Sequence, residues 1–277
     1  MNVQLITDST CDLTAQEAKE MGVKVVPLKT LFQDKEYFDG IDLSAEEFYE
    51  KMERSKKLPT TTQPTPAAFE QTFFECEGSE IVVLLIAKEL SGTVQSAQIA
   101  NETTQRGAWI VDSSSATIGM RVLLLRAVAL RDEGKSAKEI YDVLQEEKKK
   151  VRICAMVDTL ENLKKGGRLS STSAFAGTLL GIKPILQVKD GIISVWEKAR
   201  GAKKAYDMIL KYTKNESKID FTKPVCLGYT GKKESFEPFY EFAKKTWNLQ
   251  NPMVSAIGSV IGTHAGAGAV AIAYFED

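Results

Sequence analysis

The sequence has very little histidine and no clustered cysteines, which leaves little scope for metal or redox chemistry. His264 is the single histidine among 277 residues, and the four cysteines are widely separated, with no Cys-x-x-Cys pair. A structural zinc site needs several cysteine or histidine ligands at close spacing, so none is predicted. Free, scattered cysteines are typical of a reducing compartment. We therefore expect a cytoplasmic protein without a metal or an organic cofactor.

The sequence also lacks an excess of charge and a long hydrophobic run. Lysine and arginine together number 36 against 37 acidic residues, a formal net charge of -1. No surplus of positive charge is available to neutralise a nucleic-acid backbone. No apolar run reaches the roughly 20 residues of a membrane-spanning helix, and the first residues do not have the pattern of a signal peptide. We expect no nucleic-acid partner, no integral membrane association and no export.

Common enzyme motifs are missing as well. There is no G-x-x-x-x-G-K-[ST] phosphate loop and no G-x-S-x-G elbow, and a Ser-His-Asp triad would depend on His264. Residues 266–271 do have the G-x-G-x-x-A spacing of a dinucleotide-binding turn. Such a turn needs a following helix and an acidic residue about 20 positions on, but only six residues remain after Ala271. We interpret residues 269–275 as a final buried strand that follows a glycine-rich turn.

Apolar runs alternate with helical patterns over the first 150 residues. Strands are predicted over residues 3–6, 23–28, 81–87 and 109–111, and helices after Thr14, Ser44 and Thr65, from about Thr93, and over 116–133. The stretch IVVLLIA at 81–87 is apolar throughout, as expected of a parallel strand that is covered on both faces. This alternation predicts a mostly parallel sheet with helices on both sides.

The pattern changes near residue 150. Residues 151–157 read as a strand, Asp158-x-x-Glu161 as a helix cap, and residues 184–196 as two strands joined by Asp190-Gly191, a strong hairpin signal. Antiparallel pairing therefore enters the second half. We predict an α/β fold of two closely packed α/β domains, with a mostly parallel sheet in residues 1–150 and a mixed sheet in residues 151–277.

Hydroxyl-rich stretches follow several of the predicted strands. They occupy residues 7–10, 60–62, 91–93 and 112–115. Ligands of open α/β sheets bind outside the carboxyl ends of the strands, and hydroxyl and backbone N–H groups can hold a carboxylate or a phosphate without a cation. The same residue types also cap helices and form turns, so one such stretch alone is explained by structure. Their recurrence favours a binding site.

Five short motifs resemble those of the DegV family of bacterial fatty-acid-binding proteins, in the family's order and over nearly the whole chain. They are Ile6-Thr7-Asp8-Ser9-Thr10-Cys11-Asp12-Leu13, Thr61-Thr62-Gln63-Pro64-Thr65, Leu90-Ser91-Gly92-Thr93, Gly166-Gly167-Arg168-Leu169-Ser170 and Gly262-Thr263-His264-Ala265-Gly266. The resemblance implies two α/β domains that hold one long-chain fatty acid between them. It also implies a carrier without turnover of its own, which presents the acyl carboxylate to a fatty acid kinase. The kinase makes acyl phosphate for phospholipid synthesis.

The resemblance also implies a role for particular residues. Thr61 and Ser91 would hydrogen-bond the carboxylate, and His264 would lie close to this head group. Arg168 would contact the kinase, although a cation at a helix end can equally bind a backbone carbonyl. Residues 175–182 are apolar with small side chains, and they could form either a wall of the acyl tunnel or an ordinary core helix.

Two other classes of function stay open at this point. The first is a hydrolase or phosphotransferase that uses the Asp8/Ser9 or the Asp112/Ser113 loop with His264 as its base, because a lone histidine can titrate near neutral pH. The second is a nucleotide-binding regulator. Neither a third residue that would orient His264 nor a metal set can be named for an enzyme.

Overall fold

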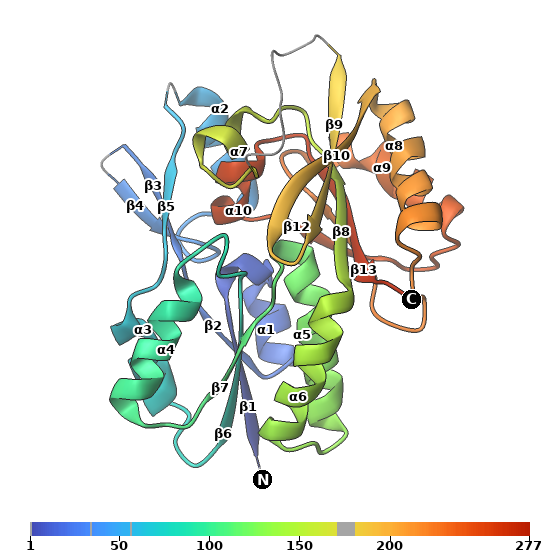
Figure 1. Ribbon diagram of the computed structural model, residues 1–277. Helices are drawn as coiled ribbons and strands as arrows, with labels where there is room; N and C mark the ends of the chain where they lie inside the picture. The colour runs from blue at the N-terminus through green and yellow to red at the C-terminus, as the bar shows by residue number, and fades with distance from the viewer. Residues whose placement is uncertain (1, 34, 56, 171–180) are drawn as a thin grey trace.

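The structure is a computed structural model that describes residues 2–33, 35–55, 57–170 and 181–277. Within these residues the chain forms a parallel sheet, a larger mixed sheet and a small antiparallel sheet (Figure 1). The α/β fold class, with one parallel-strand sheet and one mixed sheet, is confirmed.

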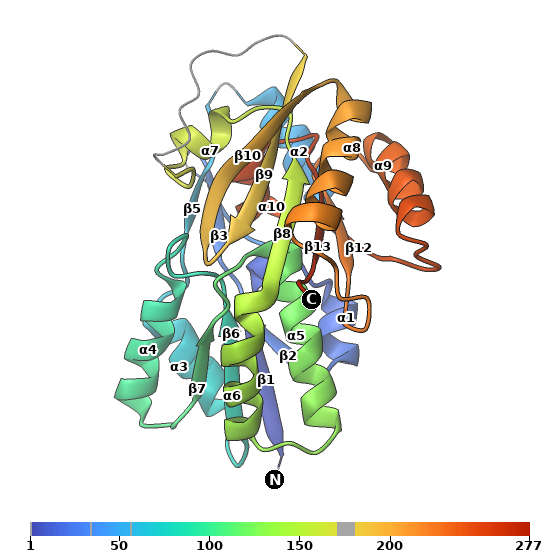
Figure 2. The ribbon, with the colours of Figure 1, turned by 45° about the vertical axis from the view of Figure 1, so that its right-hand side comes forward.

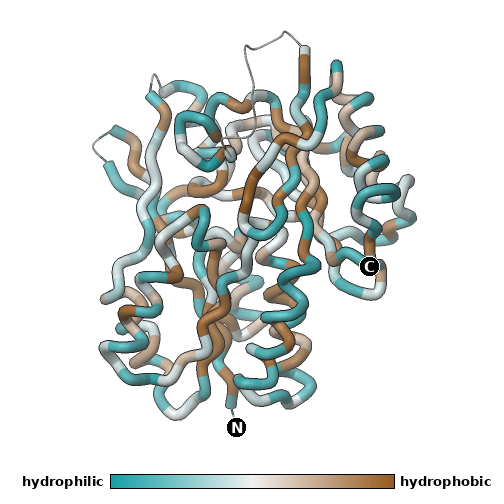
Figure 3. The backbone as a smooth tube through the Cα atoms, in the orientation of Figure 1, coloured by the Kyte–Doolittle hydropathy of each residue, from teal (hydrophilic) through white to brown (hydrophobic). Residues whose placement is uncertain are grey.

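The parallel sheet lies in the N-terminal half and has the strand order β2-β1-β6-β7. Its strands are β1 (Val3–Asp8), β2 (Val23–Val26), β6 (Glu80–Leu85) and β7 (Trp109–Asp112). Helices α3 (Pro66–Phe74) and α4 (Thr93–Thr104) cover one face, and α1 (Ala15–Glu20), α5 (Thr117–Asp132) and α6 (Ala137–Glu147) lie on the other side (Figure 1). Figure 3 shows hydrophobic residues concentrated in the strands between these helices. Burial on both faces explains why residues 81–87 are apolar throughout.

The mixed sheet lies in the C-terminal half and has the strand order β10-β9-β8-β13-β11-β12. Its strands are β8 (Val151–Met156), β9 (Ile182–Lys189), β10 (Ile192–Arg200), β11 (Cys226–Tyr229), β12 (Met253–Ala256) and β13 (Val270–Phe275). Helices α8 (Ala202–Lys211) and α9 (Lys233–Thr246) lie on its outer side, as Figure 2 shows. The predicted hairpin and the predicted final strand are both confirmed, because Asp190 and Gly191 join β9 to β10 and every residue of β13 is buried.

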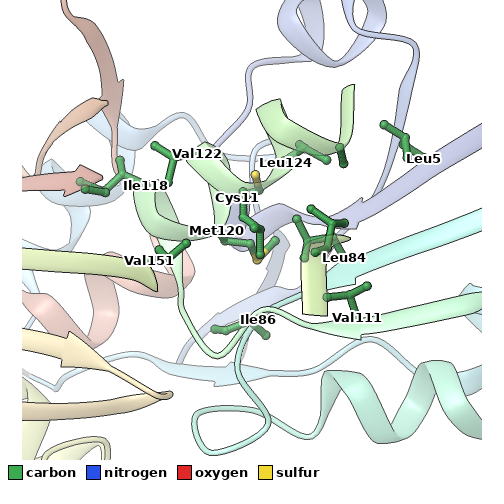
Figure 4. Packing of buried hydrophobic residues seen from close by; sticks show 14 of the residues in the cluster. Leu5, Cys11, Leu84, Ile86, Val111, Ile118, Met120, Val122, Leu124 and Val151 are labelled. Carbon is green, nitrogen blue, oxygen red and sulfur yellow. The ribbon is translucent and has the colours of Figure 1, made fainter. Parts of the chain in front are cut away.

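Helix α5 joins the two larger sheets into one hydrophobic core. Its first eight residues are all buried, so it has no solvent-facing side there. One cluster contains Leu84 of the parallel sheet, Ile118 and Val122 of α5, and Val151 of the mixed sheet (Figure 4). A helix that is buried on all sides is typical of a position between two layers. The chain enters the mixed sheet at β8, which begins at Val151. The division into two domains at residue 150 stays a prediction.

A small antiparallel sheet forms an extension that the sequence did not predict. It has the order β4-β3-β5, from β3 (Lys29–Phe32), β4 (Lys35–Phe38) and β5 (Thr60–Thr62). Together with α2 (Ala45–Arg54) it packs against α10 (Ser259–Ala265) of the C-terminal half. The Tyr49 hydroxyl of α2 donates a hydrogen bond to the Ile257 carbonyl at 2.9 Å. Strands β3 and β5 and helix α2 therefore connect the parallel-sheet half to α10 of the C-terminal half (Figure 1).

The helix starts agree with the capping signals except at one position. Thr14 and Ser44 form the predicted capping boxes with Glu17 and Glu47. The predicted cap at Asp158 is wrong, since α7 (Glu161–Lys165) begins later and the Asp158 carboxylate instead pairs with Lys183 of β9 at 2.5 Å. An ion pair with a neighbouring strand has replaced the local cap.

Candidate ligand-binding site

A cavity of about 380 Å³ lies between the parallel-sheet half and the mixed sheet. This volume is within the range of small-molecule sites. Both halves of the chain supply its apolar wall, which consists of Leu28, Ile86, Leu90, Ala116, Ile153, Ala155, Val157, Leu163, Leu186, Val188, Ile193, Ile257, Val260, Ile261, Ala265, Ala269 and Ala271. Two small side chains of the mixed sheet lie side by side in this lining, since Ala155 of β8 pairs directly with Ala271 of β13. The wall suits a long apolar ligand.

The four residues singled out by the sequence all line this cavity. Thr61 comes from β5, Ser91 precedes α4, Arg168 follows α7, and His264 lies in the last turn of α10. Four segments that are far apart in the sequence therefore bring polar groups to one site. Their individual roles in ligand binding stay predictions.

His264 is held by Thr61 and is neutral. The imidazole Nε2 lies 3.0 Å from the Thr61 hydroxyl oxygen, and Nδ1 is buried without a hydrogen-bond partner among the described residues. Burial, aided by the positive charge of Arg168, lowers the pKa of His264 to about 4. The ring therefore carries no charge at neutral pH, and it offers one N–H donor and one acceptor nitrogen.

Because Gly166 has no side chain, its backbone can lie close to the His264 ring. A Cβ atom at position 166 would lie 2.2 Å from His264 Nδ1, which is far inside van der Waals contact. The motif around Gly166 and the motif around His264 therefore pack directly against each other. Asn162 of α7 adds a hydrogen bond to the carbonyl of Thr263 at 3.3 Å.

Ser91 lies beside the start of α4, in a loop that Gln63 fixes. The Ser91 and Thr93 hydroxyl oxygens are 2.8 Å apart, and Ser91 is half-buried. The Gln63 amide donates to the carbonyl of Gly92 at 3.0 Å and to the hydroxyl of Ser96 at 2.9 Å. Gln63 was not predicted as a site residue, although it lies inside the motif Thr61-Thr62-Gln63-Pro64-Thr65. This side chain connects the Thr61 and Ser91 segments.

Arg168 binds two backbone carbonyl oxygens at the edge of the cavity. Its Nε donates to Leu90 O at 3.1 Å and its Nη1 donates to Gly166 O at 2.5 Å. These contacts agree with the alternative role of Arg168, in which a cation near a helix end binds a backbone carbonyl. The residue is half-buried.

Two of the four hydroxyl-rich stretches lie outside the cavity wall, because their side chains are used within the fold. The buried Asp8 carboxylate accepts hydrogen bonds from the Thr10 and Ile86 N–H groups, at 2.9 and 2.8 Å. Burial raises its pKa to about 6. The buried Ser113 hydroxyl donates to Ser115 O at 3.1 Å.

The structure describes the glycine-rich turn fully but only part of the predicted acyl wall. Gly266 follows α10 and Gly268 precedes β13, so the predicted strand after the turn is confirmed. For the predicted wall at 175–182, residues 175–180 lie outside the described residues, and Ile182 is the first residue of β9.

The arrangement does not support a hydrolytic triad or a metal centre. In the described part of the chain His264 shares its hydrogen bond with Thr61, whereas Asp8 and Ser9 are absent from the residues that line the cavity. Those described ranges also contain no group of three or more His, Cys, Asp or Glu residues that could hold a metal ion. None of the helices in them is long and apolar enough to cross a membrane.

Comparison with known proteins identifies relatives over the full length. The family model of the uncharacterised DegV family proteins matches residues 2–277. A DegV domain-containing protein of Caldanaerobacter subterraneus subsp. tengcongensis is 36% identical, with 99% of each chain covered.

Solved structures share the fold. A DegV family protein from Thermus thermophilus that binds fatty acid has a TM-score of 0.90 and 32% identity, with 100% of both chains covered. DegV of Bacillus subtilis, a fatty-acid-binding protein, has a TM-score of 0.87 and 30% identity, again with full coverage of both chains. A stearic-acid-binding protein from Eubacterium ventriosum has a TM-score of 0.90 and 26% identity, over 99% of this chain and 98% of its own. This chain belongs to the DegV family.

Proposed function

We propose that the protein binds one long-chain fatty acid in this cavity and presents the acyl carboxylate to a fatty acid kinase, which phosphorylates it to acyl phosphate. In this proposal the protein is a cytoplasmic carrier subunit without turnover of its own, and it serves phospholipid synthesis. The observation that carries the proposal is a cavity whose lining is mostly apolar and which Thr61, Ser91, Arg168 and His264 also line. The fatty-acid-binding relatives from Thermus thermophilus and Bacillus subtilis support the ligand class.

The apolar wall would supply most of the affinity. A chain of sixteen carbons buries on the order of fourteen methylenes at about 0.8 kcal/mol each, or roughly 11 kcal/mol before the costs of ordering. The wall contains no acidic or basic side chain apart from Arg168 and the neutral His264. An acyl tail therefore meets no desolvated charge along its length.

The polar group of residues suits a carboxylate that must stay reactive. Thr61 and Ser91 offer hydroxyl donors, and neutral His264 can offer an N–H. Since the Arg168 Nε and Nη1 groups already bind carbonyl oxygens, the carboxylate is not tied up in a bidentate ion pair. Neutral donors stabilise the anion but leave its oxygens free to attack a phosphoryl group.

Native mass spectrometry of freshly purified protein tests the ligand class. We expect a mass increase of one fatty acid per chain, and extraction with organic solvent should identify that acid by gas chromatography. A protein that carries no lipid, and that binds no oleate after delipidation, would contradict the proposal.

The partner assignment needs a reconstituted kinase assay. We expect Arg168→Ala to retain fatty-acid binding and to form acyl phosphate much more slowly, because Arg168 is proposed to contact the kinase. Lys165→Ala is the matched control, since Lys165 is an exposed cation nearby whose partner is Glu161 of the same helix. Equal rates for the Arg168 variant and for the wild type would remove Arg168 from the kinase interface.

A further inference from the structure

Two carboxyl groups, the buried Asp39 and the half-buried Asp12, lie at the start of α10 and outside the residues that line the cavity. Asp12 follows β1, and Asp39 follows β4. The Asp12 Oδ1 accepts a hydrogen bond from Gly258 N at 2.8 Å, and the Asp39 Oδ1 accepts from Ser259 N at 2.9 Å and from Ser259 Oγ at 2.7 Å. No side chain of α10's own segment caps this helix start. Two backbone N–H groups at this helix start, those of Gly258 and Ser259, therefore bind side chains of two other segments.

We propose that Asp12 and Asp39 are positioning residues of the ligand site, because together they hold the first residues of α10, the helix that carries His264 into the cavity. This inference rests on the proposed function, in which the cavity binds the fatty acid. Helix α10 also supplies Val260, Ile261 and Ala265 to the wall. A displacement of the start of α10 would therefore move both these apolar side chains and His264.

The contacts of Asp12 connect α10 to a second part of the cavity. Its Oδ2 accepts a hydrogen bond of 2.6 Å from the hydroxyl of Thr117, and Thr117 lines the cavity at the start of α5. The carbonyl oxygen of Asp12 accepts from Arg121 Nη1 at 2.9 Å and from Ser255 Oγ at 3.1 Å. Asp12 thus joins the loop after β1, the start of α5 and the start of α10.

The two carboxyl groups also face each other across Gly258. A Cβ atom at position 258 would lie 3.0 Å from the Asp12 Oδ1 and 3.0 Å from the Asp39 Oδ1. Burial, followed by the negative charge of Asp39, raises the pKa of Asp12 to about 8, and burial raises the pKa of Asp39 as well. The pair therefore holds a proton at neutral pH. Above pH 8 that proton leaves, and two negative charges repel each other at the start of α10.

The other groups that face the pair do not titrate in this range. Burial raises the pKa of Cys11 and of Tyr49 well above their ordinary values, and it raises the pKa of Cys226 to about 12. Burial also raises the pKa of Asp8, but only to about 6. The remaining facing groups are Arg121 and its ion-pair partner Glu17. Hydrogen bonds from Thr14 and the charge of Arg121 lower the pKa of Glu17, although burial acts in the opposite direction. Ionisation of Asp12 is the local event between pH 7 and pH 9.

The ring-proton signal of the single histidine measures the position of α10 without any ligand. Because the pKa of His264 is about 4, its own titration is complete below pH 7. We expect this signal in delipidated wild-type protein to shift between pH 7 and pH 9. Asp12→Asn and Asp39→Asn should each abolish the shift, since either amide leaves at most one negative charge. Asp8→Asn is the matched control, a buried carboxyl outside the α10 contacts, and it should keep the shift.

Calorimetric titration with oleate provides the second measurement. We expect the affinity of the wild type and of Asp8→Asn to fall by about tenfold from pH 7 to pH 9, which corresponds to about 1.4 kcal/mol. For Asp12→Asn and Asp39→Asn, the ratio of the affinity at pH 7 to the affinity at pH 9 should be close to one. The same histidine shift and the same affinity ratio in all four proteins would overturn the proposal. If no variant or wild type binds oleate, the proposed function fails, while the histidine signal still decides whether the two carboxyl groups position α10.

Discussion

Thr61 and Ser91 contribute through single hydroxyl groups, so their removal should have a defined cost. We expect Thr61→Ala and Ser91→Ala each to weaken fatty-acid binding by about 1–3 kcal/mol, the cost of one lost hydrogen bond to a charged group. Thr60→Ala is the control, because Thr60 is exposed in the same strand and does not line the cavity. Titration calorimetry measures the change. Unaltered affinity in both variants would refute the head-group assignment.

Gly166 tests the placement of the imidazole independently of hydrogen bonding. Gly166→Ala would put a methyl group 2.2 Å from His264 Nδ1, so the ring has to move. We expect a changed histidine NMR signal and weaker fatty-acid binding. Gly167→Ala is the companion variant, since residue 167 has a φ of +69° and open space around it. It should cost about 1 kcal/mol of folding stability through backbone strain and leave the histidine signal in place.

At the level of secondary structure, the β9–β10 hairpin connects the mixed sheet to the loops after β6 and β7. Gly191 N donates to Ser114 O at 2.7 Å, and a Cβ at position 191 would lie 2.5 Å from the carboxylate of Glu89. Val188 and Ile193, on either side of this turn, line the cavity. The tip of the hairpin therefore fixes one wall of the site against the N-terminal half.

Replacement of the hairpin glycine should affect both stability and binding. We expect Gly191→Ala to lower the free energy of unfolding by roughly 1–3 kcal/mol. The causes are backbone strain at a φ of +77° and the close contact of the new methyl group with Glu89. Gly134→Ala has a similar φ of +83° in open space, and it should show the cost of strain alone. Urea unfolding and oleate titration of both variants separate the two effects. An equal loss of stability in both would mean that the methyl group at position 191 displaces Glu89 without a cost.

The elements that sequence predicted well are those with strong local signals. The capping boxes at Thr14 and Ser44, the Asp190-Gly191 turn and the apolar strand at 81–87 each specify their structure within a few residues. The β3–β5 sheet lacked such a signal, because its strands have only three or four residues and β5 consists of three threonines. Short polar strands form there through tertiary contacts with α2 and α10.

The candidate site was only partly accessible from the sequence. Thr61, Ser91, Arg168 and His264 were named through motif resemblance, and the structure brings them to one cavity. Asp39 carries no sequence signal, since an Asp-Gly pair is ordinary turn chemistry. Its contact with Ser259 joins residues 220 positions apart, and such pairings depend on the tertiary fold.

For the whole molecule, the buried position of α5 has a consequence for how the chain unfolds. Because the same helix completes the core of both larger sheets, neither sheet can lose its partner without exposing the residues of α5 to water. We expect the two halves to melt as one cooperative unit, with equal calorimetric and van't Hoff enthalpies. A fragment that ends at residue 150 should behave as a molten globule, with retained far-ultraviolet circular dichroism and strong dye binding. A well-folded fragment, or two separate transitions, would contradict this view. Cooperativity of this kind would also make the cavity an all-or-none property of the folded chain, because its two walls would form and disappear together.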